Sequence, residues 1–207
     1  GTVMPKYVKT GIRTRLLPFV VLALIFPLTR TVTAVGDSRQ SDIVVYGATP
    51  AGISVALAAA AGKCNVLLIE PTSWIGGMTT HGLSHSDFHS FESLHGLFLT
   101  FSQRVLKHYE STFGKDSSQV RDCWRGTHGE PSVNLLIFQK MLAEKPSIRI
   151  LTEHRLIDVT VMDESITGLK FARPEAAPVT ITAKIVIDAS YEGDLLAAAG
   201  VSYRVGR

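Results

Sequence analysis

A glycine-rich hexapeptide, Gly47-Ala-Thr-Pro-Ala-Gly52, is the first segment whose residue types and spacing could do chemistry. Its place between a β-branched run and an Ala-rich stretch is typical of a turn that holds a dinucleotide pyrophosphate. There the first Gly bends the chain, the free N–H groups of the helix face the phosphates, and the last Gly permits close packing. Thr49 replaces the usual middle Gly, and its hydroxyl could donate to a phosphate. Taken alone, the hexapeptide also fits an ordinary βα turn.

Glu70 follows Gly47 by 23 residues, at the end of the next apolar run. A carboxylate at about 20 residues from the first Gly can accept hydrogen bonds from the ribose hydroxyls of an adenosine and would repel a 2′-phosphate. A solvated Glu at a strand end is the alternative. Together with the hexapeptide, Glu70 predicts a site for a dinucleotide without a 2′-phosphate.

A third segment, Thr182-Ala-Lys-Ile-Val-Ile-Asp-Ala-Ser190, distinguishes flavin from nicotinamide. It resembles the second fingerprint of the two-dinucleotide-binding-domain flavoproteins of the glutathione reductase class. In that class a Thr-Ala pair, a strand and an Ala-Thr-Gly turn follow an antiparallel meander. Tyr191 stands here in place of the terminal Gly. The resemblance favours FAD as the cofactor.

Three motifs together resemble a narrower family. They are Val45-Tyr-Gly-Ala-Thr-Pro-Ala-Gly-Ile53, then Trp74-Ile-Gly-Gly-Met78 with Gly82-Leu-Ser84 and Asp87, then Ile187-Asp-Ala-Ser-Tyr-Glu-Gly-Asp-Leu-Leu196. In this order they are similar to the FAD-dependent oxidoreductase family of secreted bacterial proteins, some of which are labelled xanthan lyase-related. The resemblance runs from about residue 42 to residue 207, the N-terminal portion of such a protein.

The resemblance implies contacts with FAD for twelve residues. Gly47, Thr49, Pro50, Ala51 and Gly52 would cradle the pyrophosphate, Glu70 would hold the adenosine ribose, and Gly76, Gly77 and Met78 would follow the phosphate–ribityl side. The backbone amide of Leu156 would meet adenine, and Ala189 and Ser190 would close over the cofactor. The implied activity is hydride transfer from an unknown organic substrate to flavin. The alternatives are an inactive truncated FAD-binding fragment and a flavin-scaffold protein with lyase-type chemistry.

Histidines recur at a spacing of four, at His81, His85 and His89, with Asp87 between them. On a helix they would share one face and could bind a metal ion. The Gly and Ser residues among them favour a loop beside the flavin instead, and we therefore predict no metal site. One of His81, His85 or Asp87 could then act as an acid/base group, although no catalytic residue is assigned. Trp124 and Arg125 could contact a ligand, but packing accounts for Trp124 equally well.

Hydrophobic periodicity predicts the elements that position these residues. Strands are expected at Asp42–Tyr46, Asn65–Ile69 and Ile148–Leu151, and helices at Ile53–Ala61, Leu94–Glu110, Pro131–Ala143 and Leu195–Ala199. Arg155–Val161, Ser165–Ala172 and Val179–Thr182 should form an antiparallel meander, followed by a last buried strand at Lys184–Asp188. The fold class is α/β: a Rossmann-like FAD/NAD(P)-binding domain with a parallel sheet and a meander crossover. We expect it to be truncated before the last strand and the substrate domain.

Composition is that of an ordinary globular protein, with 45% apolar and 19% charged residues in 207. The net charge of +3 comes with no basic face interleaved with aromatic residues, so we expect a small-molecule substrate and no nucleic-acid partner. Cys64 and Cys123 lack the spacing of a zinc site and could be free thiols or a disulfide.

The N-terminus resembles an export signal. Basic residues precede an apolar stretch, Leu16–Leu28, of 13 residues, and Val32 and Ala34 supply a cleavage site. A spanning helix needs about 20 residues, so a cleaved signal is favoured over an uncleaved anchor. We therefore divide the chain into a signal peptide (1–34), a linker (35–41) and an FAD-binding domain (42–207) with a helical insertion at about 72–130. The expected location is periplasmic or secreted.

Overall fold

The computed structural model describes residues 40–83 and 85–206. They belong to one compact unit, Gly36–Arg207. The expected signal peptide at residues 1–34 and most of the expected linker lie outside the described residues. Within the described part of the chain, no helix combines the length and apolarity needed to cross a membrane.

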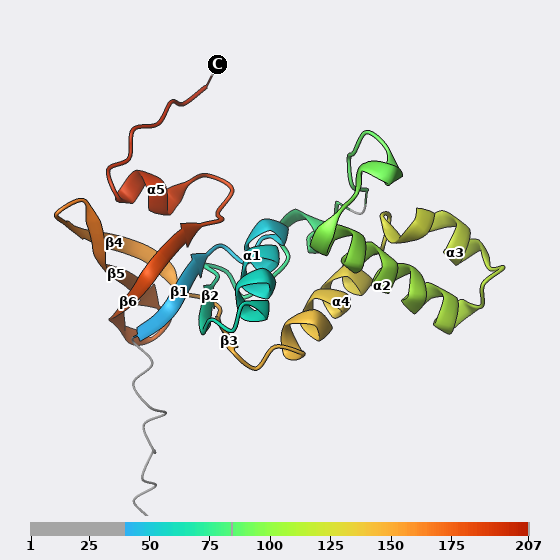
Figure 1. Cartoon of the computed structure of the whole chain (residues 1–207), viewed down its shortest axis with the longest axis horizontal. Helices are drawn as coiled ribbons and strands as arrows, with labels where there is room; N and C mark the ends of the chain where they lie inside the picture. The colour runs from blue at the N-terminus through green and yellow to red at the C-terminus, as the bar shows by residue number, and fades with distance from the viewer. Residues whose placement is uncertain (1–39, 84, 207) are drawn as a thin grey trace, which may run out of the picture. The chain divides into compact units, whose positions relative to one another are not determined.

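A six-stranded mixed sheet forms the centre of this unit, in the order β3-β2-β1-β6-β5-β4 (Figure 1). The strands are β1 (Gln40–Tyr46), β2 (Val66–Ile69), β3 (Ile148–Leu151), β4 (Arg155–Met162), β5 (Ser165–Arg173) and β6 (Ala176–Asp188). β3, β2, β1 and the end of β6 run parallel, whereas β4, β5 and the start of β6 form an antiparallel meander. This is the Rossmann-like α/β fold with a meander crossover that the sequence predicts.

β1 is buried on both faces because each face meets a different layer. Ile43 and Val45 point into a core shared with the helices, while Val44 and Tyr46 point into a second core with the meander residue Phe171. Side chains alternate along a strand, so a continuous apolar run supplies both cores at once.

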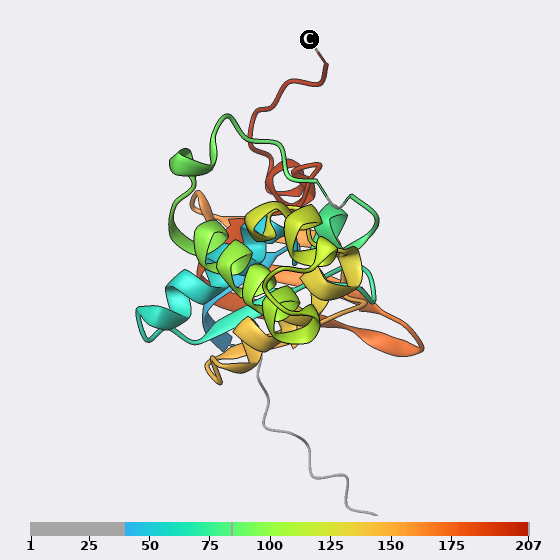
Figure 2. The ribbon, with the colours of Figure 1, turned by 90° about the vertical axis from the view of Figure 1, so that its right-hand side faces the viewer.

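The helices lie mainly on the first of these two faces. They are α1 (Pro50–Ala61), α2 (Gly96–Phe113), α3 (Ser118–Asp122), α4 (Pro131–Ala143) and α5 (Asp194–Ala198), with short 3-10 turns at Gly77–Thr80, Phe91–Ser93 and Trp124–Gly126. Figure 2 shows α2 and α4 side by side in front of the sheet. Phe101 of α2 stacks on Phe138 of α4 with ring centroids 4.3 Å apart, which joins the helical insertion to the core.

The end of the meander differs from the prediction. We expected separate strands at Val179–Thr182 and Lys184–Asp188, but the structure has one strand of 13 residues, β6. Its first half pairs antiparallel with β5, and its second half pairs parallel with β1. The change of partner falls between Ile181, the last residue paired with β5, and Thr182, the first paired with β1, and the strand continues through it.

Two further predictions, one of a boundary and one of burial, need correction. β1 begins at Gln40, so Gln40 and Ser41 belong to the sheet and not to the linker, and they pair with Thr182 and Ala183 of β6. The second half of β6 is less buried than we predicted, with Ile185 53% exposed. In the described residues this half pairs with β1 only, which leaves its other edge uncovered.

Phe171→Ala should destabilise the fold strongly, because Phe171 is fully buried and packs against Tyr46 with centroids 5.9 Å apart. We expect a loss of about 3–5 kcal/mol in the free energy of unfolding, measured by urea titration with circular dichroism. Phe113→Ala, at a side chain that is 49% exposed, is the matched control and should cost far less. Equal losses in the two variants would contradict the two-core description.

Candidate dinucleotide-binding site

A hollow of about 370 Å³ lies where β1, β2 and β6 end. Such a position is where ligands bind in open α/β sheets, because the chain leaves β1 toward β2 on one side while β6 flanks the other. The volume is at the lower end of the usual range for ligand pockets. Its lining residues are Gly47, Thr49, Glu70, Pro71, Thr72, Trp74, Gly77, Met78, His81, Ser190, Tyr191, Glu192 and Asp194.

The first glycine of the hexapeptide is required by its conformation and by a close approach. Gly47 has a φ of 97°, and a Cβ there would lie 2.7 Å from the carbonyl oxygen of Ala189 and from the amide nitrogen of Ser190. A Cβ at Gly52 would overlap the carbonyl oxygen of Gly47. The two glycines therefore bring α1, the turn and the end of β6 into contact, as the sequence pattern predicts.

Thr49 caps α1 and also joins it to β6. Its Oγ1 accepts a hydrogen bond from the Gly52 amide (3.2 Å) and donates to the Ala189 carbonyl oxygen (2.8 Å). The sequence allows this hydroxyl to donate to a phosphate, and in the structure its only proton is directed to Ala189. Side-chain capping leaves other N–H groups of the first turn without an intrahelical acceptor, and the positive end of the helix faces the hollow.

Glu70 is 93% buried, so its carboxylate must be satisfied by hydrogen bonds. Oε2 accepts from the Ala48 amide at 2.8 Å, while Oε1 accepts from the amide and the hydroxyl of Thr72 at 3.0 and 2.8 Å. A carboxylate offers about four acceptor positions, so Oε2 retains one. Glu70 lines the hollow, and this remaining position is available to a hydroxyl group of a ligand.

The second glycine pair lies against the first turn. The Gly76 amide donates to the Ala48 carbonyl oxygen at 2.7 Å, and the Met78 amide donates to Oη of Tyr191 at 2.9 Å. Gly77, with a φ of 53°, has no room for a Cβ because the Tyr191 hydroxyl occupies that position. The segment 76–78 thus connects to both turns that border the hollow.

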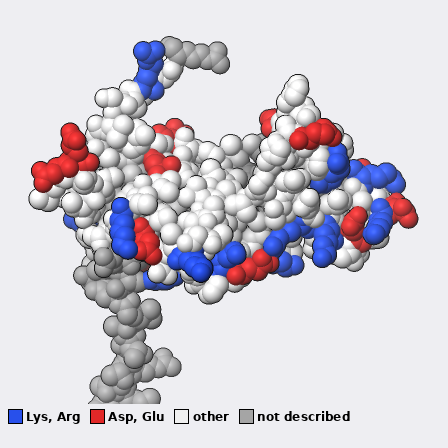
Figure 3. All heavy atoms as spheres, viewed as in Figure 1, with Lys and Arg blue, Asp and Glu red and all other residues white. Residues whose placement is uncertain are grey.

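Charge is distributed unevenly around the hollow. Its lining contains Glu70, Glu192 and Asp194 but no Lys or Arg. In Figure 3, Lys and Arg side chains lie mostly along the lower edge and the right-hand end of the molecule, with Asp and Glu side chains among them. A bound anion would therefore rely on N–H and O–H donors instead of cationic side chains.

Of the twelve residues assigned by resemblance, six line this hollow: Gly47, Thr49, Glu70, Gly77, Met78 and Ser190. Pro50, Ala51 and Gly52 form the first turn of α1, while Gly76 and Ala189 bond directly to the hexapeptide. Leu156, in β4, is not among the lining residues, and its amide donates to Oη of Tyr46 at 3.3 Å.

The histidine segment is a loop after the 3-10 turn at Gly77–Thr80, as the glycine and serine residues in it predict. His81 lines the hollow and meets the Trp74 ring edge-on, with centroids 5.3 Å apart. The His85 ring lies against His128 at 4.0 Å. Burial, with a smaller effect of His85, lowers the pKa of His128. Among the described residues, no three His, Cys, Asp or Glu side chains converge as a metal site.

Trp124 and Arg125 belong to the helical insertion and do not line the hollow. Trp124 stacks on Phe88 with centroids 5.6 Å apart, and the Arg125 guanidinium lies 3.5 Å from the Phe91 ring centroid. These contacts hold the loop against the insertion, so packing explains both side chains. Cys123 is buried, Cys64 is partly exposed, and both thiols are free.

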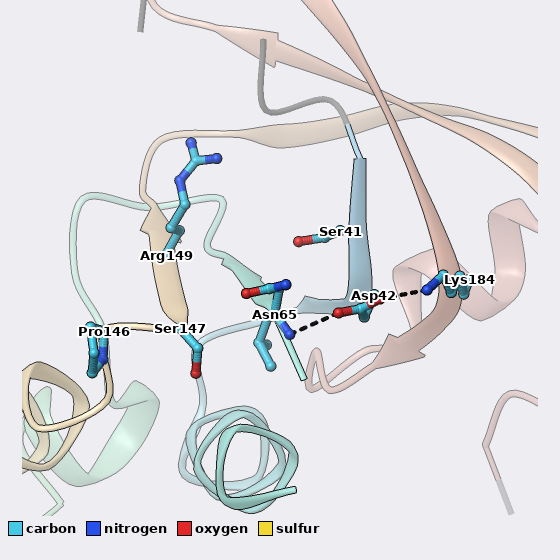
Figure 4. Close-up of a pocket in the computed structure, with 8 residues that line it drawn as sticks. Ser41, Asp42, Asn65, Pro146, Ser147, Arg149 and Lys184 are labelled. Carbon is cyan, nitrogen blue, oxygen red and sulfur yellow. Dashed lines mark hydrogen bonds and ion pairs between the residues drawn. The ribbon is translucent and has the colours of Figure 1, made fainter. Parts of the chain in front are cut away.

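A second hollow, of about 450 Å³, lies at the opposite ends of the strands (Figure 4). Asp42 accepts from Lys184 Nζ at 2.7 Å and from the Asn65 amide at 3.0 Å, and the hydrogen bond from Lys184 is the main reason that the pKa of Asp42 is lowered. This exposed pair contributes little to stability. Since ligands in such sheets bind at the carboxyl ends of the strands, we assign this hollow no ligand.

Several lining residues were not found by sequence reasoning. Thr72 lies between the two glycine motifs and Trp74 opens the second one without an assigned role, and their hydroxyl and indole groups are used locally. Tyr191 was noted only as a departure from a glycine pattern. That departure was the available signal, because a large side chain in place of Gly must occupy space that the pattern leaves to the ligand or to a neighbour.

Comparison with protein families and known structures gives a consistent result. The family model described as FAD dependent oxidoreductase matches residues 42–207. No curated protein matches the chain. Among solved structures, the chain is similar to the anhydrotetracycline hydroxylase OxyS from Streptomyces rimosus (11% identity, TM-score 0.55), covering 81% of this chain and 35% of that one.

Two other structures are similar in the same way. The p-nitrophenol 4-monooxygenase PnpA from Pseudomonas putida has 13% identity and a TM-score of 0.52, with 79% of this chain and 44% of that chain covered. AlpK has 16% identity and a TM-score of 0.53, with 78% and 34% covered. At these identities the likeness shows the fold alone. The chain spans between about a third and a half of the length of these three proteins.

Gly47→Ala should destabilise the chain because the new Cβ meets backbone atoms of Ala189 and Ser190 that cannot move independently. Gly82→Ala is the matched control, since Gly82 also has a positive φ (125°) but no atom within 4 Å of the added Cβ. We expect Gly47→Ala to lower the free energy of unfolding by roughly 1–3 kcal/mol more than the control. Equal losses in urea titrations would show that the close approach to β6 costs nothing.

Proposed function

The chain belongs to the FAD dependent oxidoreductase family, and we propose that it forms the FAD-binding part of an enzyme that passes hydride from a small organic substrate to flavin. The observation that carries the proposal is the convergence of Gly47, Glu70 and Ser190 on one hollow at the ends of β1, β2 and β6. These residues come from three separate motifs. FAD, when bound, supplies the electron chemistry, and the protein supplies position and electrostatics.

The residues around the hollow suit the adenosine diphosphate part of FAD. The start of α1 borders the hollow at Thr49, where N–H groups without an intrahelical acceptor can approach phosphate oxygens. The acceptor position that remains on Glu70 is suited to a ribose hydroxyl. We assign the pyrophosphate to the start of α1 and the ribose to Glu70.

Three further assignments concern adenine, proton transfer and export. For Leu156 to meet adenine through its amide, the 3.3 Å hydrogen bond to Tyr46 must be exchanged for one to the ligand. Among the candidate acid/base groups His81, His85 and Asp87, His81 is the one that lines the hollow, which favours it as the proton-transfer group. The apolar stretch Leu16–Leu28 supports export of the protein.

FAD binding does not by itself fix the reaction, and the chain spans between about a third and a half of the length of the three similar structures. A chain that holds FAD without turnover and a flavin-scaffold lyase are therefore the competing functions. Both keep the hollow described above and differ in what happens to the flavin.

Flavin spectroscopy tests the proposal. The purified chain, and a longer protein that contains it, are mixed with FAD, freed of excess ligand and examined for the visible flavin band. We expect the band in both, and anaerobic bleaching of the longer protein by an organic substrate such as an alcohol or sugar. Absence of the band from both proteins contradicts FAD binding. Product formation without bleaching, in the presence of bound flavin, supports the lyase.

Glu70→Gln should weaken FAD binding, because the amide offers one acceptor oxygen where the carboxylate offers two with full charge. We expect Kd to rise on the order of 10- to 100-fold, measured by quenching of flavin fluorescence. Glu192→Gln removes the same charge from the same hollow, at an exposed side chain, and is the control. Its Kd should stay the same or fall, since it removes repulsion of the phosphates. An unchanged Kd in Glu70→Gln refutes the ribose assignment.

A further inference from the structure

We propose that the hydroxyl of Tyr191 donates a hydrogen bond to the pyrophosphate of the bound dinucleotide, which makes Tyr191 a cofactor-binding residue. The inference rests on the FAD site proposed above but not on any turnover by the enzyme. It begins from the charge of the hollow: a pyrophosphate must bind beside Glu70, Glu192 and Asp194 with no Lys or Arg in the lining. Neutral donors must then supply the hydrogen bonds that cations usually provide.

Most side-chain donors that line the hollow are committed to protein acceptors. The Thr49 hydroxyl donates to Ala189 O at 2.8 Å. The Ser190 hydroxyl donates to Asp188 Oδ1 at 2.7 Å, and the Thr72 hydroxyl donates to Glu70 Oε1 at 2.8 Å. The indole of Trp74 donates to Thr80 Oγ1 at 3.2 Å. Among the lining residues, the protons of Tyr191 and His81 are the ones not used in this way.

The Tyr191 hydroxyl is held in place and still keeps its proton. Its oxygen accepts from the Met78 amide at 2.9 Å, which fixes the ring without consuming the O–H group. A donor whose position is already fixed loses less conformational freedom when a ligand binds. His81 has no such fixed hydrogen bond and contacts Trp74 through its ring edge.

The position of Tyr191 in the chain also favours contact with the phosphates. Its neighbour Ser190 has an amide nitrogen 2.7 Å from where a Cβ of Gly47 would lie, so Tyr191 directly follows the residue that meets the first glycine turn. At the other end of the side chain, the phenol oxygen of Tyr191 occupies the position that a Cβ of Gly77 would take. Tyr191 thus spans from the end of β6 to the segment Gly76–Met78, with its oxygen at the hollow.

A purely structural role is the competing interpretation, because the hydrogen bond from Met78 could simply brace the segment Gly76–Met78. The two roles differ in their effect on the environment of the bound phosphates. A donor to phosphate affects any ligand that carries the pyrophosphate and alters the electronic environment of its phosphorus atoms. A brace leaves that environment unchanged.

Binding of FAD and ADP to the full chain tests the proposal, since ADP carries the pyrophosphate but no flavin. Calorimetry and flavin fluorescence would give Kd for the wild type, Tyr191→Phe, His81→Gln and the control Tyr203→Phe, which alters an exposed tyrosine outside the hollow. For Tyr191→Phe we expect Kd for both ligands to rise by a similar factor, on the order of 10-fold or more. The ³¹P resonances of bound ADP should shift relative to the wild type. Tyr203→Phe should bind as the wild type does, and His81→Gln should raise Kd by less than Tyr191→Phe does.

Each other outcome overturns the role of Tyr191. If Tyr191→Phe weakens FAD but not ADP, the hydroxyl serves the ribityl or flavin part. Weakened binding of both ligands with unchanged ³¹P resonances identifies a brace, and loss in His81→Gln alone assigns the donor to His81. If the wild-type chain binds FAD and ADP, and Tyr191→Phe binds both equally well, Tyr191 has no role in binding and the FAD site stands. A wild-type chain that binds neither ligand removes the site and the role together.

Discussion

The hydroxyl of Thr49 makes the contact on which the site depends, because it joins residues 140 positions apart. It accepts from Gly52, which fixes the first turn of α1, and donates to Ala189, which fixes that turn against the end of β6. Gly47 permits the approach because any Cβ would collide with Ala189 and Ser190. The hollow exists because these two turns are held together at one end of the sheet.

This arrangement explains how a site with acidic residues can receive an anionic ligand. Glu70 is largely satisfied by the Ala48 amide and by Thr72, so much of its charge is already compensated by donors of the protein. Backbone amides and the start of α1 then present positive ends of dipoles to the phosphates. Glycine is needed at positions 47 and 77 because backbone atoms of Ala189 and Ser190, and the hydroxyl of Tyr191, occupy the space that a Cβ would take.

The long strand β6 connects the site to both parts of the sheet. It pairs with β5 in the meander and then with β1 in the parallel sheet, so one continuous backbone connects the second core to the site. Asp188 at its end accepts from the amide and hydroxyl of Ser190 and from the Leu196 amide, which shapes the turn into α5. Tyr191 leaves this turn toward Met78.

Hydrophobic periodicity and turn chemistry depend on residues close in the chain, so the amino-acid sequence alone predicts the βαβ unit, the glycine turn, the position of Glu70 and the meander. The bounds of α4 and β3 are those predicted, since both lie between clear breaking residues. Three features depend on the assembled fold instead: β6 is one strand, the Thr49 proton goes to Ala189, and Tyr191 reaches Met78 across 113 residues. These contacts join residues far apart in the chain, and the order of strands in the sheet selects them, which no local pattern encodes.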